Sequence, residues 1–196
     1  MVNVGKRWHA LRAKILSVRH GPGAAILPPN VTRIHMEFAK TMEGGHMGPR
    51  KFWQNMLRRL KYHNPAVPMI VNRKATNEGA AMMHIYFSKG APIDPATLPQ
   101  NPSSAMDGSK APEPTENERV VKLDIKDKRS EEILERFIAE AEATPVTPTE
   151  EELREMEEVE KLRVKGEKDR VANAKIREEA KKQKAMLDKA RAEVAV

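Results

Sequence analysis

The last quarter of the sequence most restricts what the chain can fold into. From Thr149 to about Ala192 it contains no proline, and Gly166 is the single residue that disfavours a helix. At 1.5 Å per residue, about 40 residues predict a helix of roughly 60 Å. An apolar stripe in its first half fades after Val164, so most of this helix is expected to lie outside a core, against solvent, protein or RNA. A coiled coil is the competing interpretation, but the apolar heptads are not sustained.

The residues just before this stretch predict where the helix begins. Thr147 is a capping residue type, Pro148 fits the first helical position, and Glu150 fits the acid that reaches back to the cap.

Composition limits the size of the core. Hydrophobic residues make up 39% and aromatic residues 4% of the 196 residues, and there are 14 prolines. This predicts a core of about 90–100 residues with extensions. We expect a basic N-terminal arm over residues 1–30, a folded domain over 31–143 with a Pro-rich insertion at 90–118, and a long charged C-terminal helix over 147–194.

Two kinds of apolar periodicity predict a small α/β domain. Residues 31–39 alternate, with Ile34, Met36 and Phe38 on one side, which predicts a strand with one buried face. A turn at 76–79 suggests that the third strand is antiparallel to the second. The predicted strands are 31–39, 67–73, 81–88 and 119–126, and the predicted core helices are 50–63 and 130 to about 144.

The charge is divided unevenly along the chain. Residues 1–90 hold 15 Lys and Arg residues and three acids, a net charge of +12, whereas the remainder has a net charge of −5. This division suggests a polyanion partner for the first half and a solvated or protein-facing role for the second. A general basic bias that keeps the chain soluble is the alternative.

The cations of the arm and of the helix at 50–63 are the main candidate RNA contacts, together with His46 before this helix and Arg73 and Lys74 after it. They lack an interleaved aromatic platform, which favours contact with phosphates over recognition of single-stranded bases. A solvated helix face is the competing interpretation. The candidate residues are Lys6, Arg7, Arg12, Lys14, Arg19, His46, Arg50, Lys51, Arg58, Arg59, Lys61, Arg73 and Lys74.

The N-terminal segment also fits a mitochondrial targeting signal. It is basic, it has helically spaced apolar residues, and its first acid is Glu37. Since an arm along phosphates needs the same features, we expect a segment that serves both purposes and is retained.

The sequence lacks the residues and motifs that several classes of enzyme and binding site require. There is no cysteine, the six histidines are dispersed, and no nucleophile or nucleotide-binding motif occurs. The glycine loop at 44–48 has the wrong spacing for nucleotides and suits a turn with positive φ, although an RNA phosphate could lie at the following helix start. We therefore expect no catalytic residue, metal, cofactor, small-molecule substrate or membrane span.

One segment carries a family resemblance. Gly44 to Arg73, GGHMGPRKFWQNMLRRLKYHNPAVPMIVNR, resembles the signature of a domain family shared by mitochondrial ribosomal proteins and the B8 accessory subunit of respiratory complex I. Gly21 to Pro28, GPGAAILP, resembles the fungal mitochondrial ribosomal member in particular. The resemblance implies a thioredoxin-like fold, with a mixed four-stranded sheet and two core helices, but without thioredoxin chemistry because CxxC is absent.

The same resemblance implies a structural role in the mitochondrial matrix. We expect a constituent of the large subunit of the mitochondrial ribosome that binds ribosomal RNA and neighbouring ribosomal proteins. A small-subunit ribosomal protein and an accessory subunit of complex I remain alternatives, and an enzyme on a thioredoxin-like scaffold is a third. The charge of the N-terminal half argues against complex I, since it suits a polyanion better than a protein.

Overall fold

The chain forms two compact units. A computed structural model describes residues 4–90, 104–106 and 111–194. Lys14–Thr147 form an α/β domain, and the described residues of Met1–Ala13 and Pro148–Val196 form a helical unit. The arm predicted over residues 1–30 is thus divided between the two.

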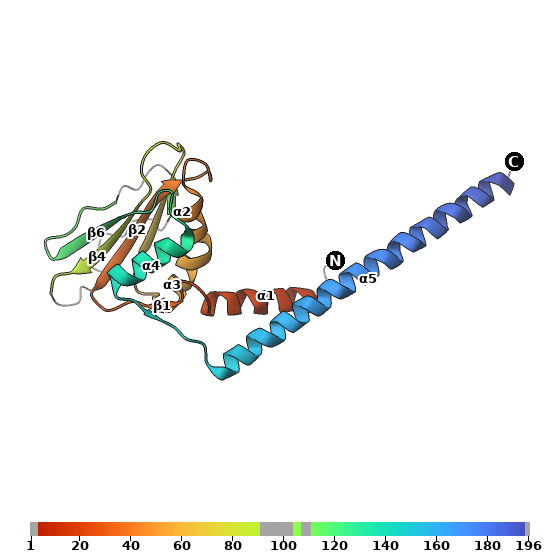
Figure 1. Ribbon diagram of the computed structural model, residues 1–196, viewed down its shortest axis with the longest axis horizontal. Helices are drawn as coiled ribbons and strands as arrows, with labels where there is room; N and C mark the ends of the chain where they lie inside the picture. Colours follow the sequence, from red (N-terminus) through yellow and green to blue (C-terminus); the bar gives the residue numbers. More distant parts are fainter. Residues whose placement is uncertain (1–3, 91–103, 107–110, 195–196) are drawn as a thin grey trace. The chain divides into compact units, whose positions relative to one another are not determined.

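A mixed sheet forms the centre of the α/β domain, with strand order β5-β3-β2-β4-β6 (Figure 1). β3 is parallel to β2 and β5 is parallel to β3, whereas β4 is antiparallel to β2 and β6 is antiparallel to β4. The four predicted strands are confirmed. The strands are β2 Val31–Ala39, β3 Met69–Lys74, β4 Met82–Ser88, β5 Ser104–Met106 and β6 Glu118–Asp124.

β5 is a short fifth strand inside the predicted Pro-rich insertion. Its three residues pair with Val71 to Arg73 of β3. The remainder of the insertion between residues 91 and 110 lies outside the described residues.

β3 and β4 run antiparallel, as predicted, but they do not pair with each other. β2 lies between them, with Ile34 opposite both Met69 of β3 and Ile85 of β4. β2 has buried residues on both faces, which suits a strand with neighbours on both sides. The turn at 76–79 therefore joins two strands that have β2 between them.

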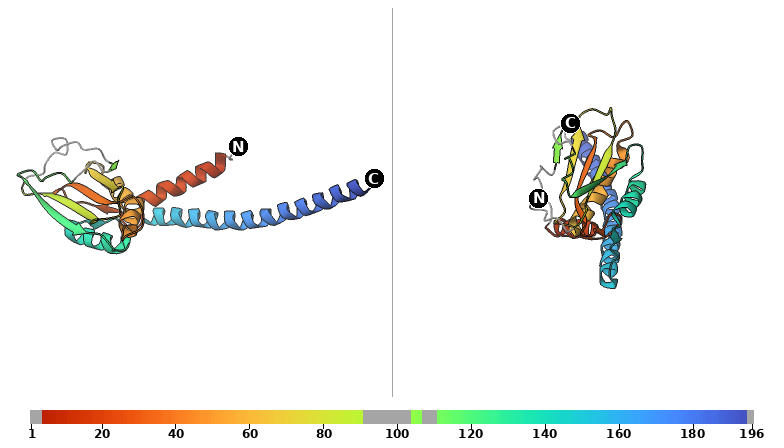
Figure 2. Two further views of the ribbon diagram at one scale, coloured as in Figure 1. Left: turned by 90° about the horizontal axis from the view of Figure 1, so that it is seen from above. Right: turned by 90° about the vertical axis from the view of Figure 1, so that its left-hand side faces the viewer.

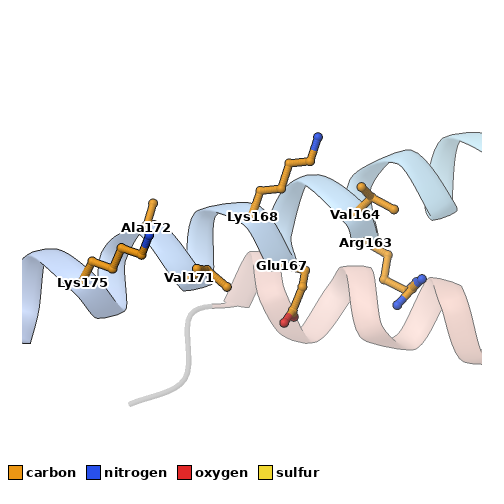
Figure 3. A pocket seen from close by; sticks show the side chains of 7 residues that line it. All are labelled: Arg163, Val164, Glu167, Lys168, Val171, Ala172 and Lys175. Carbon is orange, nitrogen blue, oxygen red and sulfur yellow. The ribbon is translucent and has the colours of Figure 1, made fainter.

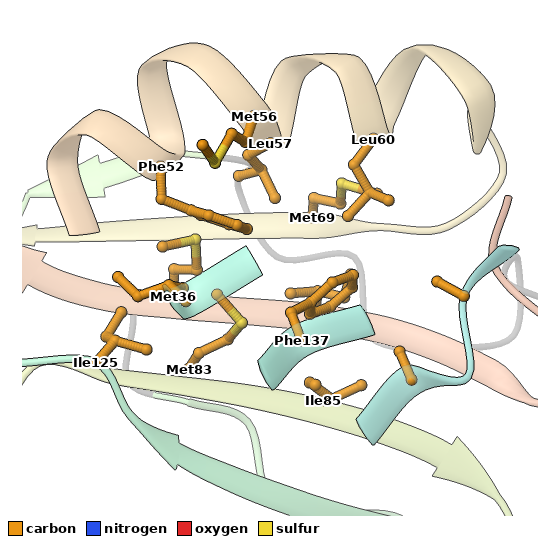
Figure 4. Packing of buried hydrophobic residues seen from close by; sticks show 14 of the residues in the cluster. Met36, Phe52, Met56, Leu57, Leu60, Met69, Met83, Ile85, Ile125 and Phe137 are labelled. Atoms are coloured by element: carbon orange, nitrogen blue, oxygen red, sulfur yellow. The ribbon is translucent and has the colours of Figure 1, made fainter. Parts of the chain in front are cut away.

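Both core helices cover the same face of the sheet (Figure 4). Met47–His63 is one continuous helix, made of α2 Met47–Phe52, the π-helical turn η1 Trp53–Leu57 and α3 Arg58–His63. The second helix is α4 Ser130–Ala141, and the rings of Phe52 and Phe137 pack 6.4 Å apart. The predicted thioredoxin-like arrangement of two helices on a mixed sheet is confirmed.

A short second sheet attaches the end of the arm to the domain. β1 Ala25–Ile26 pairs antiparallel with β7 Thr144–Pro145. Asn64, just after α3, donates to Ala25 O at 2.8 Å and accepts from Leu27 N at 2.8 Å. Gly23 (φ +95°) lies so close to the helix that an added Cβ would be 2.7 Å from Met56 O, so this position requires glycine.

The face of the sheet opposite the helices is also buried, so the prediction of a single buried face for β2 is wrong. Arg33 and Glu118 form an ion pair of 2.7 Å there, with side chains 1% and 0% exposed. The guanidinium of Arg33 lies over the Tyr86 ring, 4.4 Å from its centroid, and its Nη2 also donates to Glu113 O. A charged side chain on a central strand can be buried when a residue from a distant part of the chain neutralises its charge.

Glu118 collects most of the polar contacts in this cluster. Burial raises the pKa of its carboxyl, but the Thr115 N–H, the Thr32 hydroxyl and Arg33 outweigh burial and leave this pKa below its ordinary value. The carboxylate is therefore the stable form, and its contribution to stability is lost as the pH falls through the lowered pKa.

His84, opposite His35 on the same face, predicts a pH dependence of stability. Burial lowers the pKa of His84, and His35 and Lys122 lower it further while Glu37 raises it. As the pH falls from 7 to 5, the unfolded chain binds this proton first, so the free energy of unfolding should decrease by up to about 1.4 kcal/mol per pH unit. Urea unfolding of wild-type and His84→Phe chains at several pH values measures this. An equal decrease in both would contradict the role of His84.

Two helices make up most of the helical unit. α1 Val4–Arg19 contributes its first ten described residues, and α5 Glu150–Val194 is unbroken through Gly166 (Figure 2). α5 is 45 residues long, which corresponds to about 67 Å. Its capping box is formed by Thr149 and Glu152, two residues after the predicted start, and Pro148 precedes the helix. Pro148 is thus excluded from the first helical position because Thr149 is the cap.

Candidate nucleic-acid interface

The outer side of helix 47–63 is basic. No acid occurs between Glu43 and Glu78, and the helix buries its apolar residues against the sheet. Lys51, Arg58 and Lys61 are exposed on the opposite side. Their location on this side follows from the sequence, because cations occupy the helical positions that the apolar stripe leaves free.

Contacts with α3 hold the end of α1 against this helix. Arg59 Nε donates to Ser17 O at 2.6 Å and Nη1 donates to Pro22 O at 2.9 Å. His63 Nε2 donates to Arg19 O at 2.7 Å. Two further cations of α1 therefore belong to the same domain as the helix. We define the basic face as Lys14, Arg19, Lys51, Arg58 and Lys61.

Arg59 and Lys61 are partly used by the fold. Burial lowers the pKa of Arg59, and the neighbouring charge of Arg58 lowers it further. Burial also lowers the pKa of Lys61, whose Nζ donates to Pro65 O at 3.0 Å and Val67 O at 2.9 Å. Both side chains donate to backbone carbonyls, and Arg19 Nε donates to Tyr62 Oη at 3.3 Å. Among the described residues, Lys14, Lys51 and Arg58 are the cations of the basic face without such a contact.

Lys51 lies at the edge of the basic face, next to acidic residues. It lines a cleft of about 360 Å³ between the 44–48 loop and the start of α4. The Glu131 backbone N–H and the Ser130 hydroxyl lower the pKa of the Glu131 carboxyl, and Lys51 adds to this. A carboxylate thus already occupies the start of α4. The cleft is lined by Gly45, Met47, Gly48, Lys51, Asp127, Lys128, Arg129, Ser130 and Glu131.

The glycine loop is a turn with positive φ, at +65° for Gly44 and +84° for Gly45. His46 is 1% exposed, its Nδ1 accepts from Ala39 N at 3.3 Å, and its Nε2 donates to Asn77 O at 3.1 Å. His46 therefore holds the loop to the sheet, and its ring is not available to RNA in this conformation. His46 is not part of the basic face.

Three other candidate cations, Arg50, Arg73 and Lys74, make contacts within the protein. Arg50 Nη1 donates to Lys40 O, and its buried Nε has no hydrogen-bond partner among the described residues. The Arg73 guanidinium lies 5.2 Å from the Trp53 ring centroid. Lys74 Nζ pairs with Glu37 at 2.5 Å. These contacts stabilise the sheet and separate Arg73 and Lys74 from the basic face.

The candidate cations at the start of α1 belong to the helical unit. Arg12 Nε pairs with Glu155 at 2.9 Å and its Nη2 pairs with Glu158 at 3.5 Å, and the hydrogen bond to Glu155 raises its pKa. Arg7 is exposed, and the Lys6 side chain lies outside what the structure describes. Arg12 thus serves to join two helices.

No residue of the C-terminal helix was among the candidates from sequence, although α5 carries many cations. Twelve Lys and Arg residues lie between Lys161 and Arg191. The net charge of the second half of the chain does not reveal these cations, because the acids at the start of α5 cancel their charge. The spacing of charges along the helix, instead of their sum, is the signal that reveals these residues.

The described residues show neither a metal site nor a membrane span. Within residues 4–90, 104–106 and 111–194, no group of three or more His, Asp or Glu residues is placed to hold a metal. No helix in the same part of the chain is long and apolar enough to cross a bilayer.

Comparison with known proteins agrees with the fold and with the resemblance of Gly44 to Arg73. Residues 49–130 match the family described as the mitochondrial ribosomal protein L51 / S25 / CI-B8 domain. The chain is 45% identical over 190 residues to the large ribosomal subunit protein mL61 of Neurospora crassa, covering 97% of this chain and 94% of that protein. The chain belongs to the L51 / S25 / CI-B8 domain family of mitochondrial ribosomal proteins.

Proposed function

We propose that the chain is a structural constituent of the large subunit of the mitochondrial ribosome, in the mitochondrial matrix. The observation that carries this proposal is the 45% identity to a large-subunit protein over nearly the whole of both chains. The role has no catalytic step, cofactor or small-molecule substrate. Its partners are ribosomal RNA and neighbouring ribosomal proteins.

Within this role, the basic face contacts RNA phosphates. Support comes from its position on two helices without acids, α1 and helix 47–63, with Lys14 and Arg58 exposed and without carboxylate partners among the described residues. Lysine and arginine bind phosphates by charge and release counterions, which does not require recognition of bases.

Sedimentation tests the proposed particle directly. A tagged chain in a mitochondrial lysate, run on a sucrose gradient, is expected to move with the large ribosomal subunit. Its presence with the small subunit or with complex I would contradict the proposal and identify the alternative.

Charge reversal tests the basic face. Lys14→Glu with Arg58→Glu is expected to weaken incorporation into the large subunit about ten-fold or more, because two phosphate contacts become repulsive. Arg59 and Lys61 are left intact, since glutamate there would also break contacts with backbone carbonyls.

A matched control reverses two exposed cations outside the basic face, Lys40→Glu with Lys122→Glu, for the same change in net charge. Incorporation of this control should stay near the wild-type level. Equal losses in both variants would mean that net charge matters and that the basic face has no special role.

A further inference from the structure

α5 is divided by charge into two parts. Residues 150–160 hold seven acids and one cation, a net charge of −6. Lys161 to Arg191 hold 12 cations and five acids, a net charge of +7, and every side chain from Glu160 to Arg191 is exposed. One helix thus presents an acidic start and a basic distal part, which suit different partners.

The start of α5 already contacts protein within its own unit. Arg12 of α1 pairs with Glu155 and Glu158. An apolar groove of about 410 Å³ lies between α1 and α5, with Ala10 and Ala13 on one side and Val159 and Leu162 on the other. The protein-facing part of α5 therefore comprises its acidic start and continues to Gly166, because Leu162 and Arg163 also line the groove.

The cations of the distal part recur every seven residues in two series. We call the first series the lysine column and the second the arginine column. The lysine column is Lys161, Lys168, Lys175, Lys182 and Lys189, and the arginine column is Arg163, Arg170, Arg177, Lys184 and Arg191. A seven-residue spacing drifts only about 20° per repeat around a helix, so each column stays on one side for about 40 Å.

The two columns lie on opposite sides of α5. Their members are two residues apart, which corresponds to a rotation of about 200°. Figure 3 shows Lys168 and Arg163 projecting to opposite sides of the helix, around a shallow hollow of about 500 Å³ on its surface. A helix with cations on both flanks suits an environment that is negative on both sides.

Few of these charges are used within the chain. Lys161, Arg163, Arg170 and Lys182 pair with glutamates three or four residues away, at 2.6–3.4 Å. Exposed pairs of this kind contribute little, so phosphates can replace the glutamates. The other six members of the columns have no carboxylate partner among the described residues.

The distal part has no continuous apolar face that a protein groove could bury. Its large apolar side chains are exposed, at 41–72%: Leu162, Val164, Val171, Ile176, Met186 and Leu187. By helical geometry, Ile176 and Leu187 lie far around the helix from Val164 and Val171, and the apolar positions do not repeat as the cations do. Charge is therefore the main feature available for recognition.

We infer that Lys161 to Arg191 of α5 lie between two phosphate strands of ribosomal RNA, with the lysine column on one strand and the arginine column on the other. The two strands belong to one RNA duplex or to neighbouring duplexes, and the chemistry is the same. This inference rests on the proposed ribosomal function and gives the long helix its own contact with ribosomal RNA, in addition to that of the basic face.

Salt-dependent binding of the full-length chain to a double-stranded RNA of about 20 base pairs tests the inference, by fluorescence anisotropy at about 50–200 mM salt. Lys→Gln at Lys168, Lys175, Lys182 and Lys189 should lower the slope of log K against log salt by about 3. Arg→Gln at Arg163, Arg170, Arg177 and Arg191 should cause a similar loss. Far-UV circular dichroism should show that both variants keep their helix content.

A charge-preserving control uses Lys→Arg at the same four lysine positions and should keep the wild-type slope. Unchanged slopes in both column variants, or a loss from one column alone, would overturn the two-sided arrangement. A crosslink from Lys175 to protein instead of RNA, in purified large subunits, would also overturn it. If the chain still sediments with the large subunit in these cases, the inference alone fails. Absence from that subunit would instead be failure of the proposed function.

Discussion

Replacing Arg33 with leucine is expected to lower the free energy of unfolding by about 3–5 kcal/mol, because Glu118 would remain as an uncompensated buried charge. The Arg33–Glu118 pair is 2.7 Å long and almost completely excluded from solvent. Loss of the Arg33 contacts with Tyr86 and Glu113 O adds to the effect. Urea unfolding of the full-length chain measures the change, with all variants compared at pH 7.

Two further variants separate charge from packing. Glu118→Gln keeps an acceptor for Thr32 and Thr115 but removes the charge, so it should also destabilise the chain by leaving Arg33 unpaired. Arg33→Leu combined with Glu118→Gln should cost less than the sum of the two single losses, because neither charge then remains. Additive losses, or a single loss below about 1 kcal/mol, would show that the pair does not act as a buried unit.

The strands could be predicted from the sequence because apolar alternation is local. The bounds of β2 agree with the alternating pattern of 31–39, and the others differ by one to three residues. The burial of Arg33 could not be predicted in this way. Its partner Glu118 lies 85 residues later in the chain, and the pairing depends on which strand takes the central position. Local periodicity contains no information about that choice.

The candidate interface shows the same limit. The apolar stripe predicts that Lys51, Arg58 and Lys61 lie on the outer side of the helix, and all three are exposed there. The stripe could not separate Arg58 from Arg59, although the two are adjacent. Arg59 donates to the backbone carbonyls of Ser17 and Pro22, about 40 residues away in the chain. The charge pattern around Arg59 does not reveal these distant acceptors.

The start of α5 differs from the predicted start for another reason. The sequence offers two threonines as caps, Thr147 and Thr149, and each is followed three residues later by a glutamate. The second one forms the capping box with Glu152. In the first alternative Thr149 would already be helical, so the choice depends on the path of the chain leaving β7.

Gly48→Ala is the second substitution expected to have a large effect, with a loss of about 3 kcal/mol in the free energy of unfolding. Gly48 is buried in the first turn of α2, and an added Cβ would overlap the backbone oxygen of Lys128 in the loop before α4. A flexible side chain could move aside, but this atom belongs to the main chain. The start of α2 would have to move away from α4, which would disturb the packing of Phe52 against Phe137.

Gly166→Ala provides the matched control, since a Cβ at that position of α5 meets nothing within 4 Å. Alanine favours a helix over glycine by about 1 kcal/mol, so this variant should be as stable as the wild type or more stable. Opposite signs for the same chemical change would show that the approach of α2 to the 126–129 loop, and not the loss of glycine itself, is the cause. A Gly48→Ala chain that unfolds at the wild-type urea concentration would mean that the two helices can separate at little cost.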